Sequence, residues 1–167
     1  PRYTLSPAGC LDGDGGIELG NFRGIDIRAT HEAIRAGIAA LTGRVAARGG
    51  TLERLELEVG GVGAPPAGLM QRRLVIARWE APDRYEGYAA RIERTGVGRT
   101  RSIKLPKELA GTDVEVFVYQ VGSETRRLGT GRDRLEYMPW KPQGAYWVLA
   151  CRPGADACFV IAATRLI

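Results

Sequence analysis

Residues 94–121, RTGVGRTRSIKLPKELAGTDVEVFVYQV, place basic residues and glycines directly before a strand pattern. Gly96 and Gly98 allow the positive φ angles that a tight turn between two strands requires. The apolar alternation of 113–121 predicts a β-strand, and PKELA (106–110) predicts a single helical turn. This stretch is therefore predicted to form the second half of a hairpin with a basic turn, then a helical turn and a longer strand.

Further strand signals lie before and after this stretch, separated by turns rich in Gly, Pro and Asp. They occupy residues 72–79, 86–94, 100–106, 134–140, 145–151 and 158–167. Short strands at this spacing are typical of a barrel or a highly twisted sheet. The C-terminal two thirds of the chain are therefore predicted to be rich in strands.

The first third of the chain has a different pattern. FRGIDIR (22–28) and TLERLELEV (51–59) each alternate apolar and charged residues, which predicts two half-buried strands. Between them a helix is predicted over about 31–48, with Thr30 as its N-cap and Gly49–Gly50 after its end. The apolar stripe of this helix consists of Ile34, Ile38, Leu41 and Val45.

The predicted fold class is α+β. A strand-helix-strand lobe at about 1–62, with a further short strand at 17–19, precedes a β-rich lobe at about 69–167 that forms a twisted sheet or barrel. Residues 60–68, GGVGAPPAG, are the predicted boundary because four glycines and a Pro pair favour a linker. The two lobes are expected to share one core.

The composition narrows the class of protein. No run of apolar residues approaches the ~18 needed to cross a bilayer, and the N-terminal residues contain no apolar signal region. We therefore expect a cytoplasmic protein without a membrane partner.

Three cysteines are present, at positions 10, 151 and 158. They form no CxxC pair and have no neighbouring histidine, so neither a metal nor another cofactor is predicted. Cys151 and Cys158 flank the turn RPGADA and should face each other across a hairpin. That position allows a disulfide, but free buried thiols are favoured because a cytoplasmic chain usually keeps its cysteines reduced.

The basic residues of the chain are concentrated in one window. The formal net charge is +5, and residues 87–107 contain six basic residues against the single acidic residue Glu93, which accounts for the whole excess. Guanidinium groups beside the free amides of a glycine turn can hold phosphates through charge-assisted hydrogen bonds. The predicted nucleic-acid contacts are Arg91, Arg94, Arg99, Arg101, Lys104 and Lys107, with Trp140 as a base-stacking side chain.

The order of the elements in this region also resembles a known family. Residues 103–109, IKLPKEL, followed by VEV at 114–116, are similar to the AbrB/MazE-type swapped-hairpin transcription factors over about residues 91–121. In that family a strand ending in a Leu- or Ile-Pro-Lys/Arg motif leads into one helical turn and an acidic-hydrophobic strand. The resemblance implies an intertwined homodimer that presents basic hairpins to DNA, with Arg94, Arg99, Arg101 and Lys104 as contacts.

Three other interpretations stay open at this point. The basic strands could be a solvated sheet edge whose charges prevent aggregation. The protein could be a structural or assembly subunit of a larger complex or virion, with the apolar C-terminal strand added to the sheet edge of a partner. It could also be a tautomerase-like enzyme that uses the Pro1 amine as a base.

Catalysis has little other support in the sequence. His31 is the sole histidine and is predicted to lie on the surface, in the first turn of the helix, where the helix dipole disfavours its protonation. A non-enzymatic protein that binds DNA or RNA is therefore the leading prediction.

Overall fold

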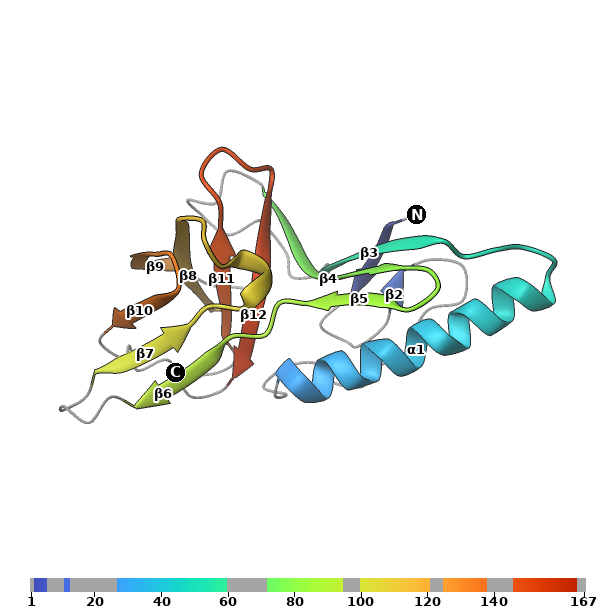
Figure 1. The fold of residues 1–167 in the computed structure, drawn as a ribbon, viewed down its shortest axis with the longest axis horizontal. Helices are drawn as coiled ribbons and strands as arrows, with labels where there is room; N and C mark the ends of the chain where they lie inside the picture. Colours follow the sequence, from blue (N-terminus) through green and yellow to red (C-terminus); the bar gives the residue numbers. More distant parts are fainter. Residues whose placement is uncertain are drawn as a thin grey trace.

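The structure is a computed structural model that describes residues 2–5, 11–12, 27–59, 72–94, 100–120, 125–137 and 146–164. Within these ranges the chain forms twelve strands, one α-helix and one 3-10 turn (Figure 1). In chain order the elements are β1 (Arg2–Leu5), β2 (Leu11–Asp12), α1 (Ile27–Ala47), β3 (Arg54–Val59), β4 (Arg73–Glu80), β5 (Arg84–Gly87), β6 (Arg91–Arg94), β7 (Arg101–Lys104), η1 (Lys107–Leu109), β8 (Val114–Gln120), β9 (Thr125–Gly131), β10 (Arg134–Tyr137), β11 (Tyr146–Cys151) and β12 (Ala157–Thr164).

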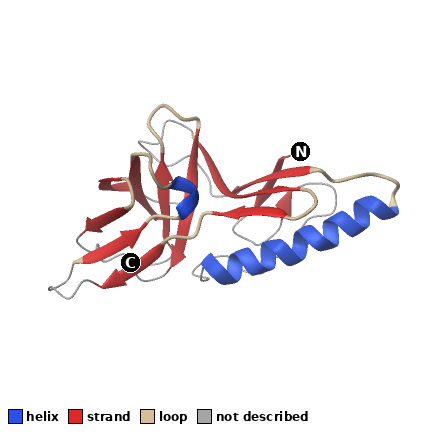
Figure 2. Ribbon diagram, viewed as in Figure 1, coloured by secondary structure: helices blue, strands red, loops and turns tan. Residues whose placement is uncertain are grey.

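Nine of these strands form one large mixed sheet. Eight of them follow one another in the order β2-β1-β3-β4-β12-β11-β8-β9. The ninth, β5, pairs with the second half of β4, whereas β12 pairs with the first half. The pairs β1–β3 and β4–β12 are parallel, and the others are antiparallel. The strands at the two ends of this order, β2 and β9, do not pair with each other, so over the described residues the sheet is open. The fold is therefore mixed α/β, with a strand-rich sheet that is not closed into a barrel (Figure 2).

The single described α-helix lies along one face of the large sheet, beside β3, β4 and β5 (Figure 1). Its predicted stripe is confirmed, because Ile34, Ile38 and Leu41 are buried and Val45 packs against them. From the sheet, Leu55, Leu57, Ala77 and Trp79 belong to this first core, which continues across β8, β11 and β12. Burying such a stripe is the main source of stability for a helix in a protein.

The predicted start of α1 is wrong. The helix begins at Ile27, so Ile27 and Arg28 are helical rather than the end of a strand, and Thr30 lies inside the helix instead of capping it. Ile27 is buried in the first core, and it falls on the same face as His31 and Ile34, which explains the extra turn. Residues 21–26, and the strands predicted at 17–19 and over most of 22–28, lie outside the described residues.

The predicted end of α1 is close to the observed one. The helix stops at Ala47, and Gly49 adopts a φ of 78° that favours glycine. The amide of Gly50 donates to the carbonyl of Val45 at 3.0 Å, and the amide of Gly49 donates to that of Ala46 at 3.0 Å. This pair of hydrogen bonds is the Schellman termination of a helix.

A second, three-stranded sheet covers the opposite face of the large sheet, at the other end of the molecule (Figure 1). Its order is β10-β7-β6, with antiparallel pairing throughout. Ile103 and Leu105 of this layer and Leu109 of η1 are buried against β8, β11 and β12. The chain therefore builds two cores, one on each face of the large sheet.

One continuous segment, residues 84–94, belongs to both sheets. The strand predicted at 86–94 is interrupted after Gly87, where β5 leaves β4, and resumes at Arg91 as β6 of the small sheet. At the crossing, the ring of Tyr88 is buried with its centroid 4.3 Å from that of Phe159, and the amide of Ala90 donates to the carbonyl of Ile161 at 2.8 Å. Burying Tyr88 in the second core is what breaks the predicted strand.

Most of the other predicted strands agree with the structure within a few residues: β3, β4, β7, β8, β10, β11 and β12 all lie at predicted positions. The helical turn predicted at 106–110 is the 3-10 turn η1. β1, β2 and β9 were not predicted. β12 pairs with β11, and its residues 157–159 also pair with β4, so this first part of the predicted C-terminal strand lies inside the sheet and not at an exposed edge. Ile167 and the linker at 60–68 lie outside the described residues.

Cys151 and Cys158 face each other in the β11–β12 hairpin, as predicted. They are joined by a disulfide, with their Cα atoms 4.4 Å apart, so the expectation of free thiols is wrong. Both residues are fully buried, so reductants reach the bond only when the hairpin opens.

Candidate nucleic-acid interface

The small sheet carries a row of three positively charged residues. In the strand register, Arg91 of β6 lies opposite Lys104 of β7, and Lys104 lies opposite Arg134 of β10. Residues directly opposite each other point to the same face, so the three side chains project together. All three are exposed. At the usual spacing between strands, the row extends about 10 Å across the sheet.

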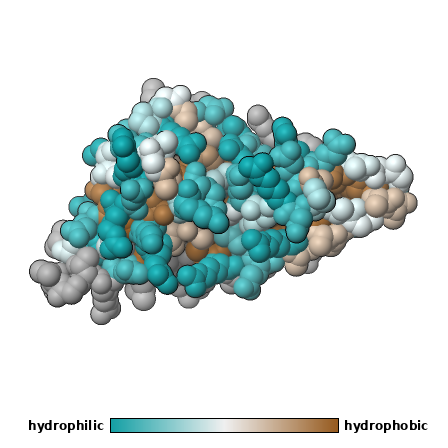
Figure 3. All heavy atoms as spheres, in the orientation of Figure 1, coloured by the Kyte–Doolittle hydropathy of each residue, from teal (hydrophilic) through white to brown (hydrophobic). Residues whose placement is uncertain are grey.

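This row lies on the outer face of the sheet. The alternate residues Ile92, Ile103 and Leu135 form the parallel row on the inner face, where they pack into the second core. Side chains alternate between the faces of a strand, so Arg91, Lys104 and Arg134 point away from that core. The side of the molecule shown in Figure 3 is mainly hydrophilic.

The outer face is not uniformly positive. Next to the cationic row lies a second row in which Ser102 has Glu93 on one side and Glu136 on the other. The Arg91 Nε atom is 3.4 Å from Glu93 Oε1, whereas Lys104, Lys107 and Arg134 form no ion pair with any described carboxylate. An anion would therefore find its strongest attraction along the cationic row rather than over the whole sheet.

Several residues predicted as contacts are located by the structure. Arg91 and Lys104 are neighbours in the row, and Lys107 is exposed at the start of η1. Arg94 lies in β6 opposite Arg101, but its side chain is outside the described residues. Arg99, the glycine turn and the stacking candidate Trp140 lie outside the described residues altogether.

Arg101 has an environment different from that of the row. Its position in β7 alternates with that of Lys104, and it lies opposite Tyr137 of β10 on the inner side of the sheet. Its side chain is half-buried, and its Nε atom is buried without a hydrogen-bond partner. Burial raises the pKa of Tyr137 to about 12, and the nearby charge of Arg101 opposes this rise. Arg101 therefore stands apart from the cationic row.

Arg134 is the member of the row that sequence reasoning missed. Alternation within RLEY does place Arg134 on the same side as Glu136, but it does not show which strand lies next to β10. The partner is β7, and a separate strand pair, β8–β9, lies between them in the chain. Only the three-dimensional pairing brings Arg134 beside Lys104.

The structure can also be inspected for a metal site, a membrane-spanning helix and the Pro1 site of the tautomerase interpretation. Among the described residues, no group of three or more His, Cys, Asp or Glu side chains is placed to hold a metal ion. None of the described helices combines the length and the apolar composition needed to cross a bilayer. Pro1, the base of the tautomerase interpretation, lies outside the described residues.

Comparisons of the chain with protein-family models, with curated proteins and with solved structures found no match.

Proposed function

We propose that this protein binds nucleic acid through the outer face of the β10-β7-β6 sheet, without catalysing a reaction. The observation that carries the proposal is the row formed by Arg91, Lys104 and Arg134. Like charges directly opposite each other on neighbouring strands destabilise a sheet. A phosphate backbone along the row would remove that repulsion, which gives the arrangement a physical reason.

The neighbouring basic residues extend the proposed surface. Lys107 follows on η1, and Arg94, Arg99 and Trp140 stay predicted contacts. Arg101 also stays a predicted contact, but its position in β7 is on the inner side of the sheet and not on the proposed outer face. The order of β6, β7, η1 and β8 is also the order that the resemblance to swapped-hairpin DNA-binding proteins implies. A homodimer therefore belongs to the proposal, and light scattering in solution would measure it.

A cytoplasmic location also belongs to the proposal, because nucleic acid is present there. The buried Cys151–Cys158 disulfide is compatible with this location only if the hairpin that contains it rarely opens.

The test is a titration of labelled random-sequence DNA and RNA oligonucleotides, followed by fluorescence anisotropy at several salt concentrations. Binding should weaken steeply with salt, since each neutralised phosphate releases counterions. The triple variant Arg91→Gln, Lys104→Gln, Arg134→Gln should lower the slope of log affinity against log salt by about 2–3 on duplex DNA.

A matched control removes the same charge elsewhere. Arg44→Gln, Arg48→Gln and Arg54→Gln change three exposed arginines in and around α1 and should leave the slope close to that of the unmodified protein. If both triple variants bind alike, the row is not the contact surface. If the unmodified protein does not bind at low salt, the proposed function is wrong.

A further inference from the structure

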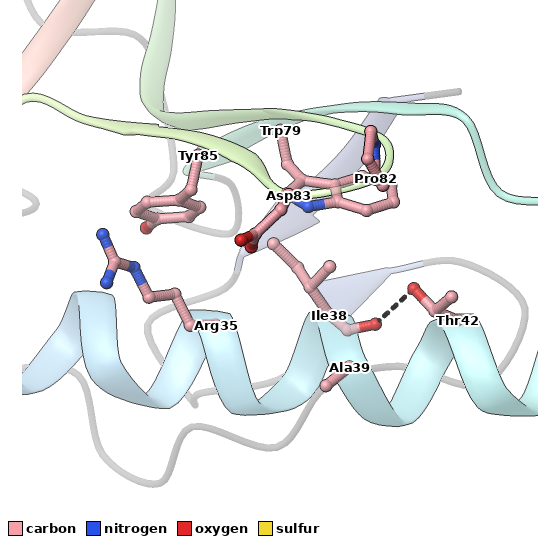
Figure 4. Close-up of a pocket in the computed structure, with 8 residues that line it drawn as sticks. All are labelled: Arg35, Ile38, Ala39, Thr42, Trp79, Pro82, Asp83 and Tyr85. Carbon is pink, nitrogen blue, oxygen red and sulfur yellow. Dashed lines mark hydrogen bonds between the residues drawn. The ribbon is translucent and has the colours of Figure 1, made fainter.

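A cavity of about 550 Å³ lies between α1 and the β4–β5 hairpin, away from the cationic row. Figure 4 shows its lining residues, which come from the helix on one side and from the hairpin on the other. The volume falls in the range of small-molecule sites, which are mostly apolar with a few polar groups. The lining includes Arg35, Ile38, Trp79, Asp83 and Tyr85.

Part of the wall of the cavity is aromatic and aliphatic, and the rest is polar, with Arg35, Thr42 and Asp83. The Trp79 indole lies along the hairpin side in Figure 4, and Ile38 projects toward it from the helix. Tyr85 forms a further part of the hairpin wall. Such surfaces favour a ligand with a flat or bulky apolar group, because contact with them removes apolar area from water.

Two opposite charges stand at different places on the wall. The guanidinium of Arg35 lies 4.7 Å from the centre of the Tyr85 ring, and no described residue forms a hydrogen bond or an ion pair with it. Asp83, from the turn between β4 and β5, likewise has no such partner among the described residues, and Figure 4 shows its carboxylate directed toward the helix. Arg35 and Asp83 do not pair with each other, so each can bind a group of a ligand.

The Tyr85 ring, over which the Arg35 guanidinium lies, is held in position by a buried neighbour. The Tyr85 hydroxyl lies 2.5 Å from Nδ1 of the buried His31, which holds the phenol ring in place. His31 fits there because Gly87 has no side chain: a Cβ atom at that position would lie 2.7 Å from His31 Nδ1. A wall that is already ordered reduces the entropy lost when a ligand binds.

We propose that this cavity binds a small zwitterion with an aromatic or bulky apolar side chain, such as a free aromatic amino acid. Its carboxylate would bind Arg35, its ammonium group would bind Asp83, and its side chain would pack against Trp79 and Ile38. A ligand with a carboxylate but no amine would bring a negative charge near Asp83 without a positive charge to compensate it. A ligand with an amine but no carboxylate would bring a positive charge near Arg35 in the same way. The zwitterion alone satisfies both charges.

The test uses L-phenylalanine and the indole N–H signals of the tryptophans in nitrogen-15 NMR spectra. L-phenylalanine should shift the Trp79 signal in a saturable way, whereas the signal of the fully buried Trp147 should stay in place. Phenethylamine, which lacks the carboxylate, and 3-phenylpropionate, which lacks the amine, should each bind about tenfold more weakly. Absence of saturation by about 10 mM L-phenylalanine would exclude a specific site.

Two variants separate the two charges. Arg35→Gln should weaken L-phenylalanine about tenfold and bind phenethylamine at least as well as the unmodified protein does, because the repulsive guanidinium is gone. Asp83→Asn should weaken L-phenylalanine equally and bind 3-phenylpropionate at least as well, for the same reason. Retained binding of the analogue shows that each variant is folded. The matched controls, Arg44→Gln on the same helix and Asp133→Asn in a distant turn, should bind as the unmodified protein does.

The opposite pattern would overturn the proposal. Equal affinity for L-phenylalanine and both analogues would mean that the charges take no part. Tighter binding of guanosine monophosphate than of L-phenylalanine would assign the cavity to a nucleotide instead.

Discussion

Acidification from pH 7 to pH 4 should destabilise this protein in part through His31. It is the only histidine of the chain, it lies in α1, and it is only 8% exposed. Its Nδ1 atom contacts the Tyr85 hydroxyl, and its Nε2 atom is buried without a partner among the described residues. Burial, and then the positive charge of Arg35, lower the pKa of His31 from 6.5 to about 4.

The sign of the effect follows from where the proton is bound. Between pH 6.5 and about 4 the imidazole takes up a proton in the unfolded chain but not in the folded protein. The free energy of unfolding is therefore at its full value above pH 6.5 and decreases as the pH falls through this window. A pKa difference of this size corresponds to at most about 3 kcal/mol, a large part of the stability of a small protein.

Two measurements test this prediction. In proton NMR the two C–H resonances of the one imidazole should titrate together with a midpoint near pH 4, and no other histidine can be confused with them. Urea unfolding at a series of pH values should show a steeper loss of stability for the unmodified protein than for His31→Gln, by up to about 3 kcal/mol. The carboxylates titrate in both proteins, so their contribution cancels in the comparison.

A titration midpoint near pH 6.5 would contradict this prediction. It would place the imidazole of His31 in water, and it would mean that α1 does not pack against the β4–β5 hairpin as described. The same conclusion follows if His31→Gln and the unmodified protein lose stability in parallel.

Two further predictions concern backbone positions and the disulfide. Gly87→Ala should destabilise the protein by about 1–3 kcal/mol in urea unfolding, because the new methyl group would lie 2.7 Å from His31 Nδ1. Gly43→Ala, in open space on α1, should instead stabilise it by about 0.5–1 kcal/mol, and an equal loss in both variants would contradict the steric argument. Replacing Cys151 and Cys158 by Ala should cost about 2 kcal/mol, since the bond closes a short loop, and equal free energies of unfolding for the double variant and the unmodified protein would show that the disulfide does not contribute.

The sequence allowed prediction of elements whose apolar residues recur with a regular period. The stripe from Ile34 to Val45 predicted most of α1, and the alternation in 113–121 predicted β8. β9 gave no such signal: TRRLGTG contains two glycines and two arginines, and it is a strand because β8 offers a free edge. The first turn of α1 was missed because Ile25 and Ile27 alternate like a strand, whereas packing onto the sheet decided the outcome for Ile27.

In the candidate sites, too, some features could be predicted from the sequence and others depend on how the strands and the helix pack. The concentration of charge at 87–107 is visible in the sequence, so Arg91 and Lys104 could be predicted as surface cations. Their alignment with Arg134, and the separation of Arg101 from them, depend on which strands become neighbours. The environment of His31 was predicted wrongly because a helical position alone does not tell which neighbour covers it. Burial by the β4–β5 hairpin arises only from tertiary packing.

The shared segment 84–94 has a consequence for any mutational study of this molecule. Tyr85, in the wall of the cavity, and Arg91, in the cationic row, are carried by the same uninterrupted stretch of chain, anchored at Tyr88. A substitution that displaces Tyr88 would disturb both places at once, and its phenotype could not be attributed to either. Genetic dissection should therefore rely on Lys104 and Arg134 for one place and on Arg35 for the other, because these residues belong to separate elements.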